Sequence, residues 1–130
     1  MRKRMLALLA ISLFALPPLL AQEIPSEVAS AFQKGNAELL AGHLGDNASV
    51  VLQGKPTNAG KQQATDAMRR FFADNKVSGF TTNHEGKRDE SSFLVGTLAT
   101  AKGKFRVNCF LRKVRERYLI YQIRIDNVND

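Results

Sequence analysis

The sequence predicts an α+β domain in which about three helices cover one face of a curved, mainly antiparallel sheet. Residues 91–127 carry most of this prediction, because they form three β-rich runs separated by two short, charged, turn-like breaks. The residues before them supply three patterns of helical period, the strongest of which covers residues 60–75. A three-stranded meander has an apolar face that must be covered. The helices are expected to provide that cover.

The first 21 residues have the pattern of a secretory signal peptide. Arg2, Lys3 and Arg4 precede an uncharged apolar run, and Ala21 supplies the small residue before the expected cut. The run is shorter than the roughly 20 residues that a membrane span needs. We therefore expect an exported protein, periplasmic or extracellular, with one domain over residues 22–130 and no stable membrane span after cleavage. The alternative is an uncleaved amphipathic anchor.

Net charge and cysteine content argue against a nucleic-acid-binding protein and against a disulfide-stabilised one. Removal of residues 1–21 leaves 16 basic and 12 acidic residues, a net charge of +4. This is an ordinary value for a soluble domain. A nucleic-acid partner is not expected, since proteins that bind nucleic acids cluster basic residues with stacking aromatics. Cys109 is the single cysteine, so the chain cannot form an internal disulfide and depends on its core.

Apolar spacing, caps and breakers define the other expected elements. A first helix runs from Ile24-Pro25 to a stop at Lys34-Gly35, and a second helix of about two turns starts at Asn36 and includes Leu44. Strands are expected over residues 48–53 and 77–84, and loops over 54–58 and 85–90. The apolar face of the helix at residues 60–75 comprises Ala64, Ala67, Met68, Phe71 and Phe72.

Side-chain alternation assigns the two faces of the meander. A two-residue turn at Lys102-Gly103 is expected to join its first two strands. The residues expected to face the helices are Leu94, Gly96, Leu98, Phe105, Val107, Cys109, Leu111, Leu119, Tyr121, Ile123 and Ile125. The arginines must lie on the opposite face, since an unpaired buried charge costs several kcal/mol. The candidate interface residues of that mixed face are Phe93, Val95, Arg106, Phe110, Arg112, Tyr118 and Arg124.

The chain also carries short sequences shared with a known family. They are Ile24-Pro25, Ala31-Phe32, Lys34-Gly35-Asn36-Ala37, Phe71-Phe72, Gly96-Thr97-Leu98, Gly103, Phe105-Arg106-Val107, Tyr118-Leu119-Ile120 and Gln122-Ile123-Arg124-Ile125. On these residues the chain, over about residues 24–126, resembles the small secreted Bacteroidota proteins of domain of unknown function family 4783. The resemblance implies a nuclear-transport-factor-2-like (cystatin-like) fold, a cone of helices against a strongly bent sheet. It implies no reaction, since this fold hosts enzymes and binding modules alike.

The residues that carry chemistry form no recognisable catalytic or metal-binding set. His43 and His84 are the only histidines and neither has a metal-ligand spacing, so no metal and no cofactor are expected. Residues 54–61 depart from the phosphate-binding loop, which needs four residues between its glycines and a Ser or Thr after its Lys. Cys109 lies in an apolar alternation and is expected to be inert. His84, Cys109 and Tyr121 are the candidates to line a cavity in the cone.

Three functions remain open on the sequence. The favoured one is a non-catalytic exported module that binds a small apolar ligand or a protein partner. The second is a homodimer built on the mixed face of the meander, whose aromatic residues and arginines are enriched at interface cores; plain solvent exposure accounts for that face equally well. The third is an isomerase-like or hydrolytic enzyme with a site in the cone cavity. The resemblance implies a fold in which some enzymes use a carboxylate and a tyrosine there; Tyr121 is the one tyrosine expected on the inner face, and the sequence pairs it with no acid.

Overall fold

The computed structural model describes residues 24–128 of the chain. The predicted signal peptide, residues 1–21, lies outside the described residues. The helices are α2 (Ser26–Lys34), α3 (Ala37–Ala41) and α4 (Lys61–Asp74). The strands are β1 (Leu44–Leu52), β2 (Lys55–Pro56), β3 (Val77–Arg88), β4 (Ser91–Thr100), β5 (Gly103–Val114) and β6 (Arg117–Asn127). The three predicted helices and the three-stranded meander are confirmed.

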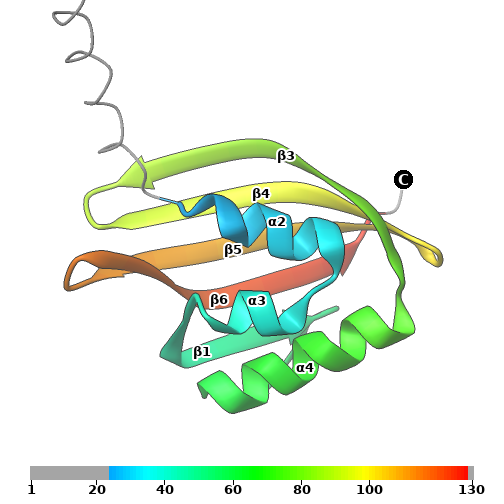
Figure 1. The fold of residues 1–130 in the computed structure, drawn as a ribbon, viewed down its shortest axis with the longest axis horizontal. Coiled ribbons are helices and arrows are strands. Elements are labelled where there is room, and N and C mark those ends of the chain that lie inside the picture. Colours follow the sequence, from blue (N-terminus) through cyan, green and yellow to red (C-terminus); the bar gives the residue numbers. More distant parts are fainter. Residues whose placement is uncertain (1–23, 129–130) are drawn as a thin grey trace, which may run out of the picture.

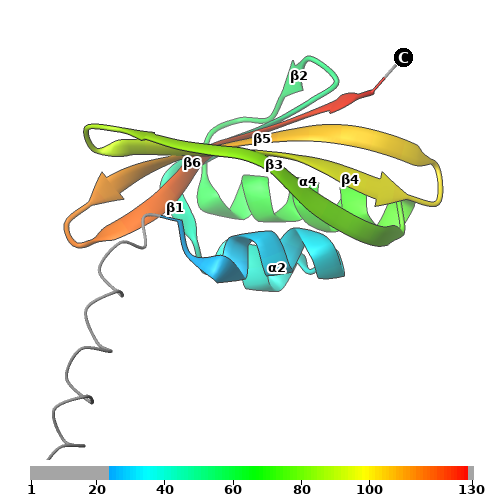
Figure 2. The ribbon, with the colours of Figure 1, turned by 90° about the horizontal axis from the view of Figure 1, so that it is seen from above.

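The strands form one sheet in the order β2-β1-β6-β5-β4-β3. Neighbouring strands are antiparallel except β1 and β6, which run parallel. The sheet is curved, and the three helices all lie on one of its faces (Figure 1 and Figure 2). We call the face toward the helices the inner face and the opposite one the outer face. The predicted α+β class with a mainly antiparallel sheet is therefore confirmed.

Local signals set the ends of the short helices. Gly35 takes a left-handed φ of 61° after α2, where its N–H donates to carbonyl oxygens of the last turn. The Asn36 side chain then accepts a hydrogen bond from the Leu39 N–H at 3.0 Å and caps α3 as predicted. Helix α3 ends before Gly42, so its predicted second turn is wrong and Leu44 begins β1. In the described part of the chain, no helix has the length and apolar character to cross a bilayer.

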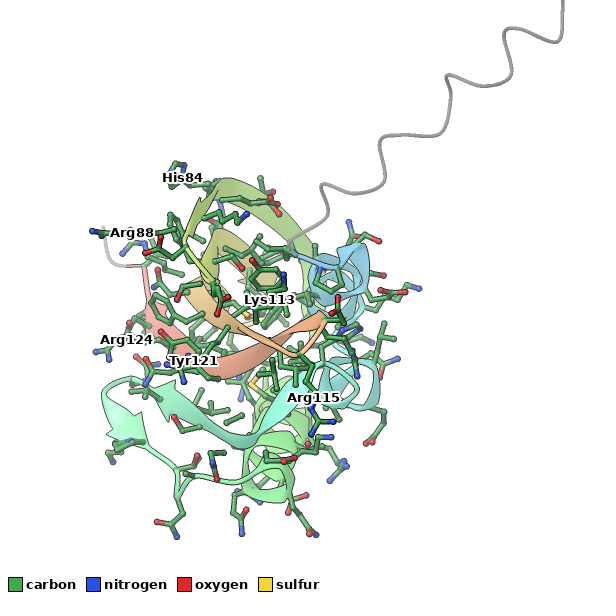
Figure 3. All side chains as sticks on the ribbon, turned by 90° about the vertical axis from the view of Figure 1, so that its left-hand side faces the viewer. His84, Arg88, Lys113, Arg115, Tyr121 and Arg124 are labelled. Carbon is green, nitrogen blue, oxygen red and sulfur yellow. The ribbon has the colours of Figure 1, made fainter. Side chains whose placement is uncertain are left out.

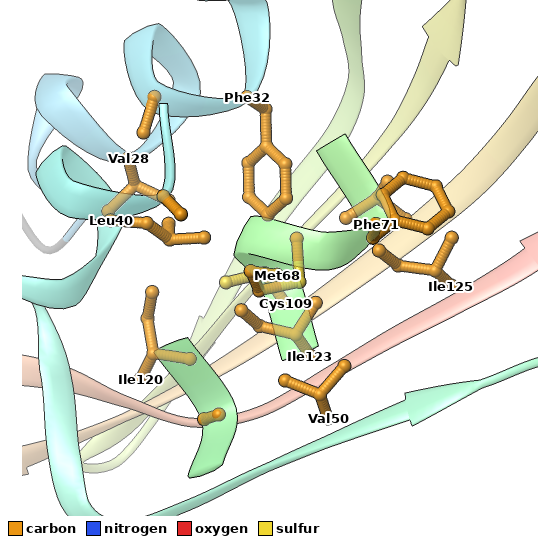
Figure 4. Close-up of a cluster of buried hydrophobic side chains, with 14 of the residues drawn as sticks. Val28, Phe32, Leu40, Val50, Met68, Phe71, Cys109, Ile120, Ile123 and Ile125 are labelled. Carbon is orange, nitrogen blue, oxygen red and sulfur yellow. The ribbon is translucent and has the colours of Figure 1, made fainter. Parts of the chain in front are cut away.

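The core lies between the helices and the inner face (Figure 4). Phe32 of α2 stacks on Phe80 of β3 with ring centroids 5.2 Å apart, and it meets Phe72 of α4 edge-on at 6.3 Å. Gly96 of β4 leaves room for this group, since a Cβ there would overlap the Phe80 ring. Besides Phe32, the fully buried side chains include Val28, Leu40, Met68, Leu94, Leu98, Val107, Cys109, Leu111, Ile123 and Ile125. Burial of this apolar surface is the main stabilising contribution to the fold.

The predicted faces of β4 and β5 are confirmed. Leu94 stands opposite Cys109 with both side chains fully buried, and the neighbouring inward positions follow the same alternation. The turn between these strands comprises residues 101–102, one residue earlier than predicted. The reason is that Gly103, at φ 123°, closes the turn and begins β5.

The predicted faces of β6 are wrong in its first half. Ile120 pairs with Leu111 and Gln122 pairs with Phe110, so Tyr121 between them is the extra residue of a β-bulge. An extra residue reverses the face of every side chain on one side of it. The alternation predicted for residues 118–121 is therefore inverted.

The bulge exchanges the places of two tyrosines. Ile120 is fully buried and Tyr118 packs against the core, whereas Tyr121 is 36% exposed and Leu119 is half-buried. Leu119 and Tyr121 thus belong to the outer face and not, as predicted, to the inner one. The exchange buries an isoleucine without enclosing the Tyr121 hydroxyl, which would need a hydrogen-bond partner in the core.

Two strands are longer than predicted. Strand β1 begins four residues early, at Leu44, and β3 continues to Arg88 through the segment predicted as a charged loop. Strand β3 is at the edge of the sheet and its side chains there are mostly exposed. Charged residues therefore do not oppose its pairing. The predicted loop at residues 54–58 contains the two-residue strand β2.

The corrected faces of β6 can be tested with two adjacent alanine substitutions. Ile120→Ala is expected to lower the free energy of unfolding by about 2–5 kcal/mol, because it leaves a cavity in the core. Leu119→Ala is expected to cost only about 1 kcal/mol, because its side chain is half-buried on the outer face. Urea denaturation followed by circular dichroism measures both. The reverse order would contradict the bulge.

The turn between β5 and β6 contains a strained residue. Arg115 has a φ of 63°, a left-handed conformation that costs a non-glycine residue about 1 kcal/mol or more. Arg115→Gly is expected to raise the free energy of unfolding by about 0.5–1 kcal/mol, since the relieved strain exceeds the added chain entropy of glycine. Glu116→Gly, at the next turn position without a positive φ, is the matched control and is expected to be destabilising. Thermal and urea unfolding midpoints of the two variants should therefore move in opposite directions.

Candidate functional site

A line of rings crosses four strands on the outer face. His84 of β3 and Phe93 of β4 have ring centroids 5.4 Å apart, and Phe93 stands directly opposite Phe110 of β5. The rings of Phe110 and Tyr121 of β6 are 6.2 Å apart, and the Arg112 guanidinium carbon lies 4.3 Å from the centre of the Tyr121 ring. These spacings are typical of aromatic and cation–π contacts. We call His84, Phe93, Phe110 and Tyr121 the aromatic track.

The track depends on a glycine in the edge strand. Gly86 of β3 stands opposite Phe93, and a Cβ at Gly86 would overlap the Phe93 ring. The ring therefore lies across the strand where a side chain would otherwise stand, and it is half-buried. A larger residue at this position would displace Phe93 from the sheet.

Three arginines share the outer face with the track, and Arg106, opposite Asp126, is the farthest of them from Phe110 along β5. The Arg124 Nε atom lies 3.4 Å from the Asp126 carboxylate. Within residues 24–128, neither Arg106 nor Arg112 has a carboxylate at ion-pair distance. Figure 3 shows Arg124 and Tyr121 on the side of the sheet opposite to the helices. Positive charge therefore exceeds negative charge around the track.

Six of the seven residues predicted for an interface share the outer face. They are Phe93, Val95, Arg106, Phe110, Arg112 and Arg124. Tyr118 does not join them, because the β6 bulge turns it toward the core, where it packs. His84, Leu119 and Tyr121 are outer-face residues that the sequence argument missed, His84 because the pairing of β3 with β4 shifts between Thr82 and His84. For Leu119 and Tyr121 the available signal was the run of four residues at 118–121, YLIY, in which no polar residue fixes the alternation.

The three residues predicted to line a cavity do not come together. Cys109 is fully buried in the core, whereas His84 and Tyr121 lie at opposite ends of the aromatic track on the outer face. The predicted inward orientation of Tyr121 is wrong, so the tyrosine named for a cavity reaction does not face the cone. In the described part of the chain, the buried polar side chains are those of Thr65 and Ser92.

Charged groups on the helix side join secondary-structure elements. Arg69 of α4 forms ion pairs at 2.7 Å with Glu38 of α3 and at 2.7 Å with Asp66, three residues earlier in its own helix. Its hydrogen bond to Glu38 is the main cause that raises the pKa of the Arg69 guanidinium. The His43 Nε2 atom lies 3.8 Å from the Glu27 carboxylate. Over residues 24–128, no three His, Cys, Asp or Glu side chains are grouped so as to hold a metal ion.

The cone of three helices on a curved six-stranded sheet defines a nuclear-transport-factor-2-like protein. A protein of this class and of unknown function from Silicibacter pomeroyi is 11% identical, with a TM-score of 0.59 over 79% of this chain and 88% of that one. A designed protein with a curved β-sheet is similarly related in fold, at 12% identity and a TM-score of 0.61 over 78% of this chain and 91% of that one. At these identities the likeness concerns the fold alone.

The chain belongs to the family described as domain of unknown function DUF4783, whose sequence profile matches residues 25–126. The crystal structure of a family member from Bacteroides ovatus is 59% identical, with a TM-score of 0.81 over 84% of this chain and 99% of that one. A member from Bacteroides fragilis is 51% identical, with a TM-score of 0.78 over 81% of this chain and 99% of that one. Comparison with functionally curated proteins gives no match. The predicted family and fold are therefore confirmed.

The state of Cys109 can be tested directly. Burial raises the pKa of its thiol, so the reactive thiolate is suppressed at neutral pH. The native protein is expected to react with a thiol reagent at least about a hundredfold more slowly than the protein unfolded in urea, because reaction must wait for opening of the core. Stopped-flow absorbance with an aromatic disulfide reagent measures both rates. Comparable rates would show that the thiol is accessible.

Proposed function

We propose that this chain is an exported binding module that holds an acidic segment of another protein against the outer face of its sheet. The aromatic track, together with the arginines of the same face, is the observation that carries the proposal. Export rests on the signal peptide pattern of residues 1–21. Binding, and not a reaction, is the activity that this face supports.

The residue types on this face favour a protein partner. Aromatic residues and arginine are enriched at the centres of protein interfaces, where rings supply apolar area and guanidinium groups supply directed hydrogen bonds. The track extends over four adjacent strands, which at about 4.8 Å per strand gives a length of roughly 14 Å. That length suits several residues of an extended polypeptide. Half-buried Phe93 and Phe110 lie at its centre.

Charge favours an acidic partner over a second copy of the same chain. Among residues 24–128, Arg106 and Arg112 have no carboxylate at ion-pair distance. Asp126, which stands opposite Arg106, pairs with Arg124. In a twofold dimer the same face would meet itself, and these guanidinium groups would approach one another. A segment rich in Asp or Glu instead pairs with them and gains charge-assisted hydrogen bonds.

The proposal predicts which substitutions abolish binding. The probes are short synthetic peptides in which Asp or Glu alternates with Leu, Phe or Tyr, and the same peptides with Lys in place of the acids. The acidic peptides are expected to shift amide NMR signals of β4, β5 and β6, and the Lys peptides are not. Phe110→Asp and Arg106→Glu should each weaken binding about tenfold or more. Arg70→Glu on α4, an exposed arginine on the helix side, is the matched control and should leave binding unchanged.

Two results would overturn the proposal. One is equal binding of acidic peptides by Arg106→Glu and by the unchanged protein, with both folded by their amide spectra. The other is a sedimentation mass of two chains that Phe110→Asp reduces to one, since this would make a second copy the occupant of the face. Because Arg106 is exposed, its substitution tests the face even where Phe110→Asp fails to fold.

A further inference from the structure

A hollow opens where β1 separates from β6. Leu44 stands opposite Ile120 and Ser49 stands opposite Gln122, so residues 45–48 of β1 face Tyr121 alone. Strands in such unequal register cannot keep a regular hydrogen-bond ladder. The space between them is a hollow of about 250 Å³. One wall is formed by residues 45–48 of β1, and the other includes Arg112, Val114, Leu119 and Tyr121.

Exposed apolar surface gathers at this hollow. Three large apolar side chains are exposed in residues 24–128: Val114 at 44%, Tyr121 at 36% and Val128 at 39%. Val114 and Tyr121 both line the hollow, and half-buried Leu119 lies between them in its wall. Concave sites with exposed apolar groups and a few polar ones are typical of ligand pockets.

Arg112 supplies the positive charge of the hollow. Its guanidinium carbon lies 4.3 Å from the centre of the Tyr121 ring, so the ring fixes its position. No carboxylate of residues 24–128 lies at ion-pair distance from it. The N–H groups at its edges are therefore available to a ligand. A planar guanidinium fits a carboxylate group with two parallel hydrogen bonds.

We propose that this hollow binds a small organic monocarboxylate with a short apolar body. The carboxylate accepts hydrogen bonds from Arg112, and the apolar body lies against Tyr121, Leu119 and Val114. The volume of about 250 Å³ equals roughly eight water molecules, which sets the size of the ligand at about six to ten non-hydrogen atoms. The hollow opens from the outer-face side chains of β5 and β6 and not from the interior of the cone.

Asp46 restricts the charge of this ligand. It lines the β1 wall, and Arg112 lies on β5, two strands away, which corresponds to roughly 10 Å between the two strand backbones. A second carboxylate at the far end of a ligand would approach Asp46 and be repelled. Monocarboxylates are therefore expected to bind in preference to dicarboxylates of the same length.

The hollow shares Tyr121 and Arg112 with the outer face, but binding of a small ligand there does not depend on the proposed binding of a protein. The hollow is complete in one chain, and its ligand needs no protein partner. Its test uses Arg112 and Asp46, whereas the test of the protein-binding face uses Phe110 and Arg106. Either can fail while the other succeeds.

Three six-carbon probes test whether one carboxylate is needed and whether a second one is excluded. They are hexanoate, the neutral hexanamide and the dicarboxylate adipate. Each is titrated into the protein, and amide NMR shifts are followed. Hexanoate is expected to shift residues 45–48 and 119–121, and to bind about tenfold or more tightly than the other two. Arg112→Gln should weaken hexanoate about tenfold or more, and Arg88→Gln, an exposed arginine at the end of β3, should not. Asp46→Asn should improve adipate binding.

Several outcomes would overturn the proposal. Equal affinity for hexanoate and hexanamide would remove the role of the carboxylate. Equal weakening by Arg112→Gln and Arg88→Gln would reduce binding to the overall positive charge of the protein. Absence of hexanoate shifts at the hollow, in a protein whose spectrum shows it folded, would exclude the site. A folded Val114→Ser variant that binds hexanoate unchanged would remove the role of the apolar wall.

Discussion

The arrangement of this domain depends on one β-bulge, at Tyr121 in β6. Ile120 and Ile123 are both fully buried, yet they are three residues apart and strict alternation would place them on opposite faces. An extra residue between them allows both to face the helices. The same residue turns Tyr118 toward the core and carries the Tyr121 ring to the outer face. The bulge that lets Ile120 face the core therefore also places Tyr121 at the end of the aromatic track.

The pairing of β1 with β6 is irregular at the same place as the bulge. Strand β6 lies between β1 and β5, so it has two separate registers to meet there. Toward β5 the extra residue is Tyr121 on β6, and toward β1 the extra residues are on β1, where residues 45–48 face Tyr121. The parallel β1–β6 pair joins distant parts of the chain through the whole meander, so its register is set by tertiary packing. The hollow beside Arg112 and Tyr121 is the consequence of these two adjustments in one place.

The sequence predicts an element correctly where its local pattern of polar and apolar residues allows only one arrangement. The faces of β4 and β5 were predictable because charged Arg106 and Arg112 alternate with buried apolar positions and leave one solution. The faces of β6 were not, because residues 118–121 are apolar or amphipathic on both faces, and only packing in the core decides between them. The extension of β3 to Arg88 was missed because an exposed edge strand tolerates the charged residues that elsewhere mark a loop. The sequence predicted which residue types lie on the outer face. It did not predict the hollow, because the hollow depends on the register between β1 and β6.

The two faces of the sheet are under different constraints. The inner face is occupied by fully buried apolar side chains from the helices and the strands, so its sequence is constrained by packing. The outer face has no such constraint from the core, and an exposed ring or an arginine without a carboxylate partner there contributes little to stability. Contacts on this face are nonetheless specific, since the Phe93 ring lies across the edge strand in the space that Gly86 leaves, and such a pair of ring and edge glycine also stabilises a sheet. The Tyr121 ring in turn holds the Arg112 guanidinium in place. Side chains fixed in this way lose less conformational entropy on binding, which is why the proposals above rest on this face.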